Sequence, residues 1–143
     1  MSIWFATPDL DELNRIHEGT AVSALGIVIT AVGEDSLSGT MPVDQRTRQP
    51  WGLLHGGASV LLAETLGSAA SMCCIDQTRW LGVGLEVNAN HVRGVRDGIV
   101  TGVARPIHLG RTLHVWGIEI RASDQRLVCI ARLTATVISQ PSK

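Results

Sequence analysis

A single carboxylate stands inside an apolar stretch of this sequence. Glu64 is the only charged residue between Ala58 and Cys74, a run composed mostly of Ala, Leu, Ser and Met. A carboxylate in apolar surroundings is costly to keep ionised unless a neighbouring group compensates for its lost hydration. Carboxylates in such places act as nucleophiles or as general bases. Glu64 is therefore the first candidate for chemistry.

Two glycines lie just before this stretch. Gly56 and Gly57 stand where a loop that contains Pro50 leads into the predicted helix. Backbone N–H groups at a helix N-terminus are fixed hydrogen-bond donors, and glycine lets a ligand approach them closely. Such donors polarise a carbonyl group that is under attack. Ser68, one turn beyond Glu64, is placed to orient the carboxylate or a water molecule.

Each candidate also has a purely structural interpretation, and the residues alone leave both open. Glu64 can pair with a buried arginine such as Arg132, and Ser68 is small enough to serve only close helix packing. His55 is as well suited to capping the helix as to contacting a substrate. Gln49, taken alone, is an ordinary solvated loop residue.

The composition indicates one globular domain, which we expect to span residues 1–143. Apolar residues make up 45% and charged residues 17% of the chain, which excludes a disordered protein. The net charge of -1 gives no support for a nucleic-acid partner. Three cysteines form neither a disulfide framework nor a zinc pattern, so we expect no metal and a cytoplasmic location.

No membrane segment or signal peptide is expected. The first five residues carry no basic start and no long apolar run. Leu53–Ile75 is long enough to span a membrane, but Glu64, His55 and several Gly and Ser residues favour a buried core helix.

Hydrophobic periodicity and turn residues predict the order helix, two strands, long helix and three or four further strands. The first helix is expected to start with Thr7 as its cap and Pro8 in its first turn, and Gly19 ends it. A short turn is expected around Ala21–Ala24, and a loose tail at Gln140–Lys143. The predicted strands are Leu25–Thr30, Leu37–Val43, Trp80–His91, Ile99–Ile107, Leu113–Ile120 and Leu127–Ile138.

The long helix, expected from Ala58 onward, is apolar or small on nearly every face. Consecutive hairpins form an antiparallel sheet, which we expect to wrap around this helix so that it is buried on all sides. One small sheet covers only part of such a helix. The remaining cover is therefore expected from a second subunit, which predicts a homo-oligomer.

Several motifs together resemble one known family. They are Met-Pro-Val-Asp at 41–44, Gln-Pro-Trp-Gly-Leu-Leu-His-Gly-Gly-Ala-Ser at 49–59, Ala-Glu-Thr-Leu-Gly-Ser at 63–68, Gly-Leu-Glu-Val-Asn-Ala-Asn-His-Val-Arg at 84–93 and Pro-Ile-His-Leu-Gly-Arg at 106–111. From Ile3 to about Ile138 the chain resembles the hotdog-fold acyl-CoA thioesterases, in particular the dihydroxynaphthoyl-CoA hydrolases and the proofreading thioesterases of enterobactin synthesis. The resemblance implies an α+β hotdog fold, with an antiparallel sheet wrapped around one long helix.

The resemblance also implies roles for individual residues. The Gly56 N–H would contact the thioester carbonyl, Gln49 and His55 would position the thioester, and Glu64 would be nucleophile or general base. No cofactor is implied, because coenzyme A belongs to the substrate. The residues that would bind the coenzyme A part are Val83, Asn90, His91, Val92, Arg93, Ile107, His108, Leu109, Gly110, Arg111 and Thr112.

The spacing of two of these residues predicts a site shared between subunits. Gly56 and Glu64 are eight residues apart, which separates them by roughly 12 Å along one helix. One carbonyl group does not bridge that span, whereas two antiparallel copies would bring Gly56 of one subunit close to Glu64 of the other. We therefore expect a dimer with two shared active sites, assembled further as a dimer of dimers.

Three functions are compatible with these residues. The favoured one is hydrolysis of an acyl-CoA, with an aromatic acyl group preferred and a carrier-protein thioester as the alternative. A hydratase or dehydratase of the same fold would pair a histidine with the helix carboxylate, but His55 precedes Glu64 in a pattern that does not match. A binding module without turnover is the third, and the complete set of candidate residues argues against it.

Overall fold

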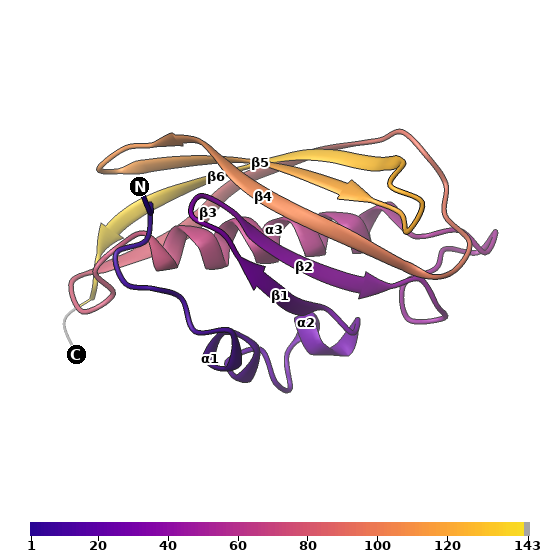
Figure 1. Cartoon of the computed structure of the whole chain (residues 1–143), viewed down its shortest axis with the longest axis horizontal. Coiled ribbons are helices and arrows are strands. Elements are labelled where there is room, and N and C mark those ends of the chain that lie inside the picture. Colours follow the sequence, from indigo (N-terminus) through magenta and orange to yellow (C-terminus); the bar gives the residue numbers. More distant parts are fainter. Residues whose placement is uncertain (142–143) are drawn as a thin grey trace.

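One long helix packs against one antiparallel sheet in the computed structural model, which describes residues 1–141 (Figure 1). The sheet has six strands in the order β1-β2-β4-β5-β6-β3. The helices are α1 (Leu10–Arg15), α2 (Ala21–Ala24) and α3 (Gly56–Cys73). The strands are β1 (Val28–Val32), β2 (Leu37–Pro42), β3 (Trp80–His91), β4 (Ile99–Leu109), β5 (Leu113–Arg121) and β6 (Leu127–Ser139).

The element order confirms the predicted sheet around one long helix. Every pair of neighbouring strands is antiparallel, and α3 contacts each of the strands β2 to β6. The tail prediction at Gln140–Lys143 falls partly outside the described residues, because positions 142 and 143 are not described.

The helix starts differ from the prediction. Thr7 is wrong as the first cap, because Asp9 Oδ1 accepts the N–H groups of Asp11 at 2.9 Å and Glu12 at 3.1 Å. A carboxylate at that position is a charged acceptor for free helix donors. The expected turn at Ala21–Ala24 is a helical turn capped by Thr20.

The bounds of two strands also differ from the prediction, each for a physical reason. The first strand begins at Val28 rather than Leu25, because Gly26 adopts a φ of 72° that breaks the extended backbone. The fourth strand continues to Leu109 through Pro106, where the pairing with β5 becomes irregular between Pro106 and His108. A proline lacks the N–H donor of a regular ladder, so a strand tolerates it at such an irregularity.

Glycines of the sheet face helix α3 and leave room for its side chains. Gly39 of β2 and Gly102 of β4 pair directly across the two strands. A Cβ at either position would lie within 3 Å of the side chain of Leu66, at 2.9 Å for Gly39 and 2.8 Å for Gly102. Leu66 therefore occupies the space that two absent side chains leave open, and it is fully buried.

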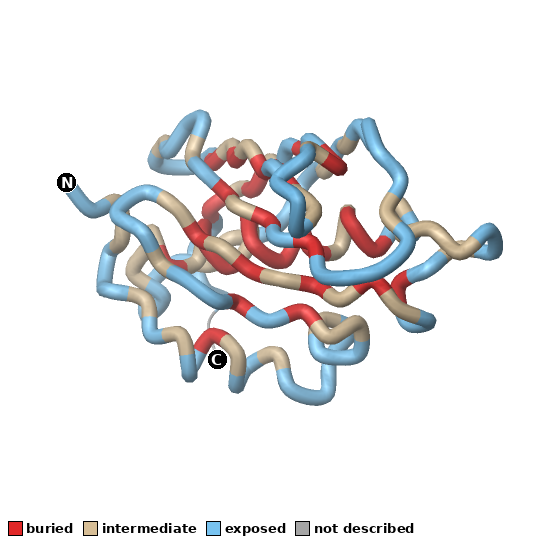
Figure 2. The backbone as a smooth tube through the Cα atoms, turned by 45° about the vertical axis from the view of Figure 1, so that its right-hand side comes forward, coloured by how far each residue is buried: buried red, intermediate tan, exposed pale blue. Residues whose placement is uncertain are grey.

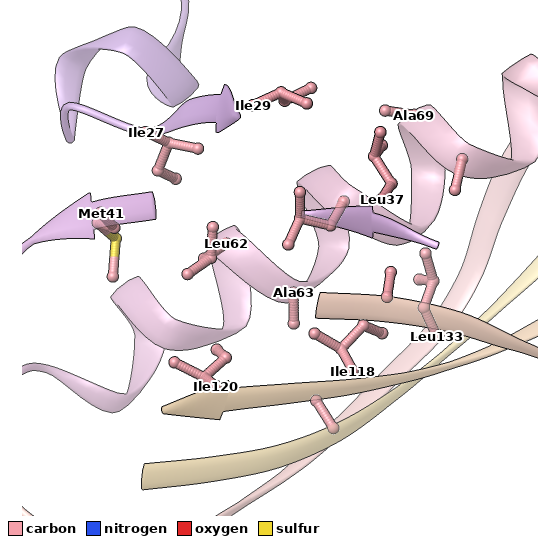
Figure 3. Packing of buried hydrophobic residues seen from close by; sticks show 14 of the residues in the cluster. Ile27, Ile29, Leu37, Met41, Leu62, Ala63, Ala69, Ile118, Ile120 and Leu133 are labelled. Atoms are coloured by element: carbon pink, nitrogen blue, oxygen red, sulfur yellow. The ribbon is translucent and has the colours of Figure 1, made fainter. Parts of the chain in front are cut away.

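In a second close contact the glycine lies on α3 and the large side chain on the sheet. A Cβ at Gly67 would lie 2.5 Å from Cδ2 of Leu133 on β6. Further along α3, the buried Trp116 of β5 donates its indole N–H to Ser71 Oγ at 2.7 Å. Figure 3 shows Ala63 of α3 pointing toward Ile118 of the sheet.

The helix is not buried on all sides. Figure 2 shows the buried residues gathered along α3 and the strand faces next to it. Val60, Glu64, Ser68 and Met72, spaced four residues apart, are only partly buried and form a stripe along α3. A single chain therefore leaves this stripe partly open, and its expected cover by a second subunit stays a prediction.

The contact between Gly67 and Leu133 predicts whether Gly67→Ala raises or lowers the free energy of unfolding. Gly→Ala in an exposed helix stabilises by about 1 kcal/mol. At Gly67 we expect the reverse, a loss of about 1–2 kcal/mol in the free energy of unfolding, because overpacking a full core outweighs that gain. Urea denaturation of wild type and Gly67→Ala measures the change.

The matched control introduces Gly67→Ala into a Leu133→Val background. Removing the δ carbons of Leu133 relieves the 2.5 Å contact but leaves Cβ of residue 133 at 3.2 Å, so the alanine should cost clearly less stability here than in the wild-type background. Stabilisation by Gly67→Ala in the wild-type background would contradict the close contact.

Candidate active site

The loop before α3 is held so that the helix begins at Gly56. The backbone N–H of His55 donates to the carbonyl of Thr47 at 2.7 Å, and Arg48 and Leu54 form a short bridge. His55 is the cap of the helix, since its Nδ1 accepts the N–H of Gly57 at 2.8 Å. The capping interpretation of His55 is thus confirmed, and its role at a substrate stays a prediction.

One backbone donor at this helix start remains free. The N–H groups of Ala58 and Ser59 both donate to the carbonyl of His55, at 3.0 and 3.3 Å. With Gly57 donating to the His55 ring, the Gly56 N–H is the one of the first four without a partner among residues 1–141. A free N–H at a helix N-terminus favours a partial negative charge, such as a carbonyl oxygen.

A cavity of about 340 Å³ lies beside this donor. Its lining joins the loop, the helix start and the residues at the end of β3: Gln49, Leu53, Leu54, Gly56, Ser59, His91, Val92, Arg93, Gly94 and Val128. A Cβ at Gly56 would lie 2.7 Å from His91 Nε2, so the imidazole sits directly over the helix start. The Gln49 side chain accepts the N–H of Trp51 at 2.5 Å through Oε1, which fixes that loop residue in place.

Glu64 faces a second cavity, of about 330 Å³. This cavity lies between the stripe of α3 and the segment that contains α1 and α2, and its lining residues are Leu13, Ile16, His17, Val22, Glu64, Thr65, Ser68, Ala69, Met72, Cys73 and Gln77. Ser68 lines it together with Glu64, as the spacing of one turn predicts. Arg132 is exposed and alternates with Leu133, which packs on α3, so it points away from Glu64.

Gly84 gives the carboxylate of Glu64 its room. A Cβ at position 84 of β3 would lie 3.1 Å from Glu64 Oε1. The pairing of β3 with β6 is irregular between Gly84 and Glu86, so the strand is locally distorted beside the carboxylate. Gly84 is not among the site residues predicted from the sequence. Its signal was a glycine inside a strand, which marks a bulge or a close approach.

The two adjacent cysteines are packing residues near this second cavity. Burial raises the pKa of the Cys73 thiol to about 11. Burial, together with the neighbouring Cys73, raises the pKa of Cys74 to about 12. Both thiols stay protonated at neutral pH and are not nucleophiles, which leaves Glu64 as the reactive candidate of this cavity.

A single chain does not bring all predicted site residues together. Gln49, Gly56, His91, Val92 and Arg93 share the first cavity, whereas Glu64 and Ser68 share the second. His55 lines neither of these two cavities and caps the start of α3.

The predicted coenzyme A segments are also separated within one chain. His91 to Arg93 lie at the N-terminal end of α3. Gly110 and Arg111 line a hollow with Cys74 at the other end of this 18-residue helix. The turn between them and β5 is tight, since the Gly110 N–H donates to the carbonyl of Leu113 at 2.8 Å.

The remaining predicted contacts lie along the sheet. Asn90 and Ile107 line a hollow on the sheet together with the exposed Arg105 and Arg132. Val83 lies on β3 and is exposed, as are His108 and Leu109 at the end of β4. The carbonyl of Thr112 accepts hydrogen bonds from Thr136 Oγ1 and the Val137 N–H.

Residues 1–141 lack two other features. None of their helices is both long and apolar enough to cross a membrane. Within the same range, no three His, Cys, Asp or Glu side chains are grouped as metal ligands are.

Known proteins share this architecture and these motifs. Residues 52–129, more than half of the chain, match the sequence profile of the Thioesterase superfamily. The chain belongs to the thioesterase superfamily. It is accordingly a thioester hydrolase, and the predicted α+β hotdog fold is confirmed.

Three members of the superfamily illustrate the similarity. Thioesterase PA1618 of Pseudomonas aeruginosa, known from a mutant crystal structure, is 55% identical with a TM-score of 0.96, covering 97% of this chain and 100% of that one. The 1,4-dihydroxy-2-naphthoyl-CoA hydrolase of Escherichia coli is 50% identical, covering 95% of this chain and 99% of the relative. The proofreading thioesterase EntH of Cronobacter sakazakii is 47% identical, covering 95% and 98%.

Proposed function

We propose that this thioesterase hydrolyses aromatic acyl-CoA thioesters at a site shared by two subunits. Glu64 of one subunit activates water or attacks directly, and the Gly56 N–H of the other polarises the thioester carbonyl. The observation that carries this proposal is the division of the candidate residues: the free Gly56 donor and the Glu64 carboxylate face different cavities.

The edge of the sheet supports the pairing of two subunits. Strand β3 ends the sheet and is 12 residues long, so one side of its backbone lacks a neighbouring strand in a single chain. Its apolar residues Val83 and Leu85 are 38% and 60% exposed. A long apolar edge strand is a template for pairing with another chain. Gly84 of this same strand lies beside the Glu64 carboxylate. Pairing along β3 would therefore bring the second subunit close to Glu64.

The reaction needs few groups. The carbonyl oxygen accepts the Gly56 N–H, which stabilises the negative charge that develops on it when the carbonyl carbon is attacked. Water, deprotonated by Glu64, adds to that carbon, or Glu64 adds first and water then hydrolyses the anhydride. The C–S bond breaks, the sulfur leaves as coenzyme A thiol with a proton, and the acyl group leaves as a carboxylate.

Two features support an aromatic acyl group. The cavity beside Glu64 is walled mainly by apolar side chains, among them Leu13, Ile16 and Met72. The relative from Escherichia coli is named for hydrolysis of an aromatic acyl-CoA. A thioester on a carrier protein is the alternative, and the similarity to the proofreading thioesterase EntH favours it.

The first prediction from the proposed function concerns Glu64. Glu64→Gln keeps the shape of the side chain and removes its charge, so kcat for thiol release should fall by about 10²- to 10⁴-fold. The assay measures free thiol from benzoyl-CoA, dihydroxynaphthoyl-CoA, hexanoyl-CoA and palmitoyl-CoA. We expect the aromatic esters to be the better substrates of the wild type.

Other outcomes assign other functions. Turnover of aliphatic esters alone would remove the aromatic preference. A shifted double bond without thiol release would mark a hydratase or dehydratase. Binding without turnover by wild type and Glu64→Gln alike would mark a binding module.

A second prediction isolates the Gly56 N–H. Gly56 is the first helical residue, where proline is well tolerated, and the preceding His55 already has the extended ψ of 129° that a following proline requires. Gly56→Pro therefore removes the donor at little cost to the helix. We expect kcat to fall by about 10²- to 10³-fold, as for loss of one oxyanion donor.

Gly56→Ala is the matched control, because it adds a Cβ near His91 and keeps the N–H. It should retain clearly more activity than Gly56→Pro. Equal losses in the two variants would mean that space beside His91, and not the donor, is what the reaction needs.

A third prediction tests whether the site is shared. A mixed dimer of Gly56→Pro and Glu64→Gln chains, purified with two different tags, would carry one site with both defects and one with neither. It should recover roughly half of the wild-type activity per dimer, although both parents are inactive. A mixed dimer as inactive as its parents would show that each site lies within one chain.

A further inference from the structure

We propose that His17 recognises a hydroxyl group on the acyl part of the substrate. This inference rests on the proposed function, since it assumes that the acyl group enters the cavity beside Glu64. It goes further by assigning a specificity-determining residue that lies outside the motifs of the sequence.

The starting observation is an unpaired polar atom. Nε2 of His17 is buried and has no hydrogen-bond partner among the described residues. Buried polar atoms in folded proteins nearly always have a partner, and an exception calls for an explanation. A ligand that supplies the missing partner is one such explanation.

The position of His17 connects this atom to the reaction. His17 lines the same cavity of about 330 Å³ as Glu64 and Ser68. We take the carbonyl carbon of the thioester to lie at Glu64, as in the proposed function, with its acyl group turned away from the coenzyme. The acyl group would then extend into this cavity, toward His17.

Two polar side chains of the cavity wall away from Glu64 and Ser68 already donate hydrogen bonds within the chain. Thr65 Oγ1 donates to the carbonyl of Leu61 at 2.7 Å. Gln77 Nε2 donates to the carbonyl of Met72 at 3.0 Å. Most of the remaining wall is apolar, so His17 is the polar group available to a substituent distant from the thioester.

The fold holds His17 in place. Asn14 fastens α1 to β1, because its side chain donates to the carbonyl of Ile29 and accepts the N–H of Ile29, both at 2.9 Å. The carbonyl of His17 accepts the Thr20 hydroxyl at 2.6 Å, which fixes the turn between α1 and α2. A residue held at both ends of its turn presents its ring in a defined position.

The chemistry of the imidazole selects the substituent. Burial lowers the pKa of His17, so the ring is neutral at pH 7 and has one donor and one acceptor nitrogen. A hydroxyl both donates and accepts, and therefore pairs with Nε2 in either tautomer. A hydrocarbon group leaves Nε2 unpaired, and a carboxylate pairs with it in the Nε2–H tautomer alone.

The test compares hydroxylated and plain esters in wild type and His17→Phe. The substrates are benzoyl-CoA and its 2-, 3- and 4-hydroxy derivatives, and the readout is kcat/KM for thiol release. We expect at least one hydroxybenzoyl-CoA to exceed benzoyl-CoA by about tenfold or more in the wild type, since a paired hydroxyl discriminates strongly. His17→Phe should remove that preference and largely retain turnover of benzoyl-CoA.

Two further variants serve as controls. His17→Gln retains a polar side chain and should keep part of the preference, and it replaces His17→Phe if that variant does not fold. Ile16→Val alters an apolar residue of the same wall and should leave the ratio of hydroxylated to plain ester as in the wild type.

The results separate this inference from the proposed function. Hydrolysis with no hydroxyl preference in the wild type, or with the same preference in His17→Phe, overturns the role of His17 and leaves the thioesterase site intact. Absence of thiol release from every ester by the wild type overturns the proposed aryl-CoA function, and the role of His17 with it.

Discussion

The packing of α3 on the sheet is the constraint on which the rest of the structure depends. Leu66 fits over two glycines on adjacent strands, Gly39 and Gly102, and Gly67 receives Leu133 from a third strand. With side chains at these glycines the helix would stand farther from the sheet. Because interiors are packed to a high density, such contacts fix both the distance and the rotation of the helix.

That rotation decides which residues can do chemistry. With Leu66 and Gly67 packed on β2, β4 and β6, the stripe of Val60, Glu64, Ser68 and Met72 is only partly buried, and Glu64 and Met72 lie beside the edge strand β3. An unpaired carboxylate inside the core would be costly, whereas on this stripe Glu64 reaches a cavity and the edge strand β3. The same contacts that stabilise the fold therefore present the candidate catalytic group to a ligand.

The arrangement also links catalysis to assembly. One helix supplies a free N–H at Gly56 and a carboxylate at Glu64, but their cavities are separate within a chain. A second copy paired along β3 would restore the proximity that a carbonyl group needs. Leu85 is exposed on this edge strand. Under the proposed function, a second subunit covers that edge and thereby completes the active site.

Sequence alone determined the family, the order of elements and the candidate residues Gly56, Glu64 and Ser68. These follow from helix and strand periodicity and from short motifs, which depend on residues that are neighbours in the chain. It missed the cap at Asp9 and the extension of β4 from Ile107 to Leu109, where side-chain hydrogen bonds and cross-strand pairing decide. Only the tertiary structure showed that Gly84 makes room for the Glu64 carboxylate and that His17 lies in the same cavity. Contacts between residues so distant in the chain have no local pattern, since they arise only when the helix packs on the sheet.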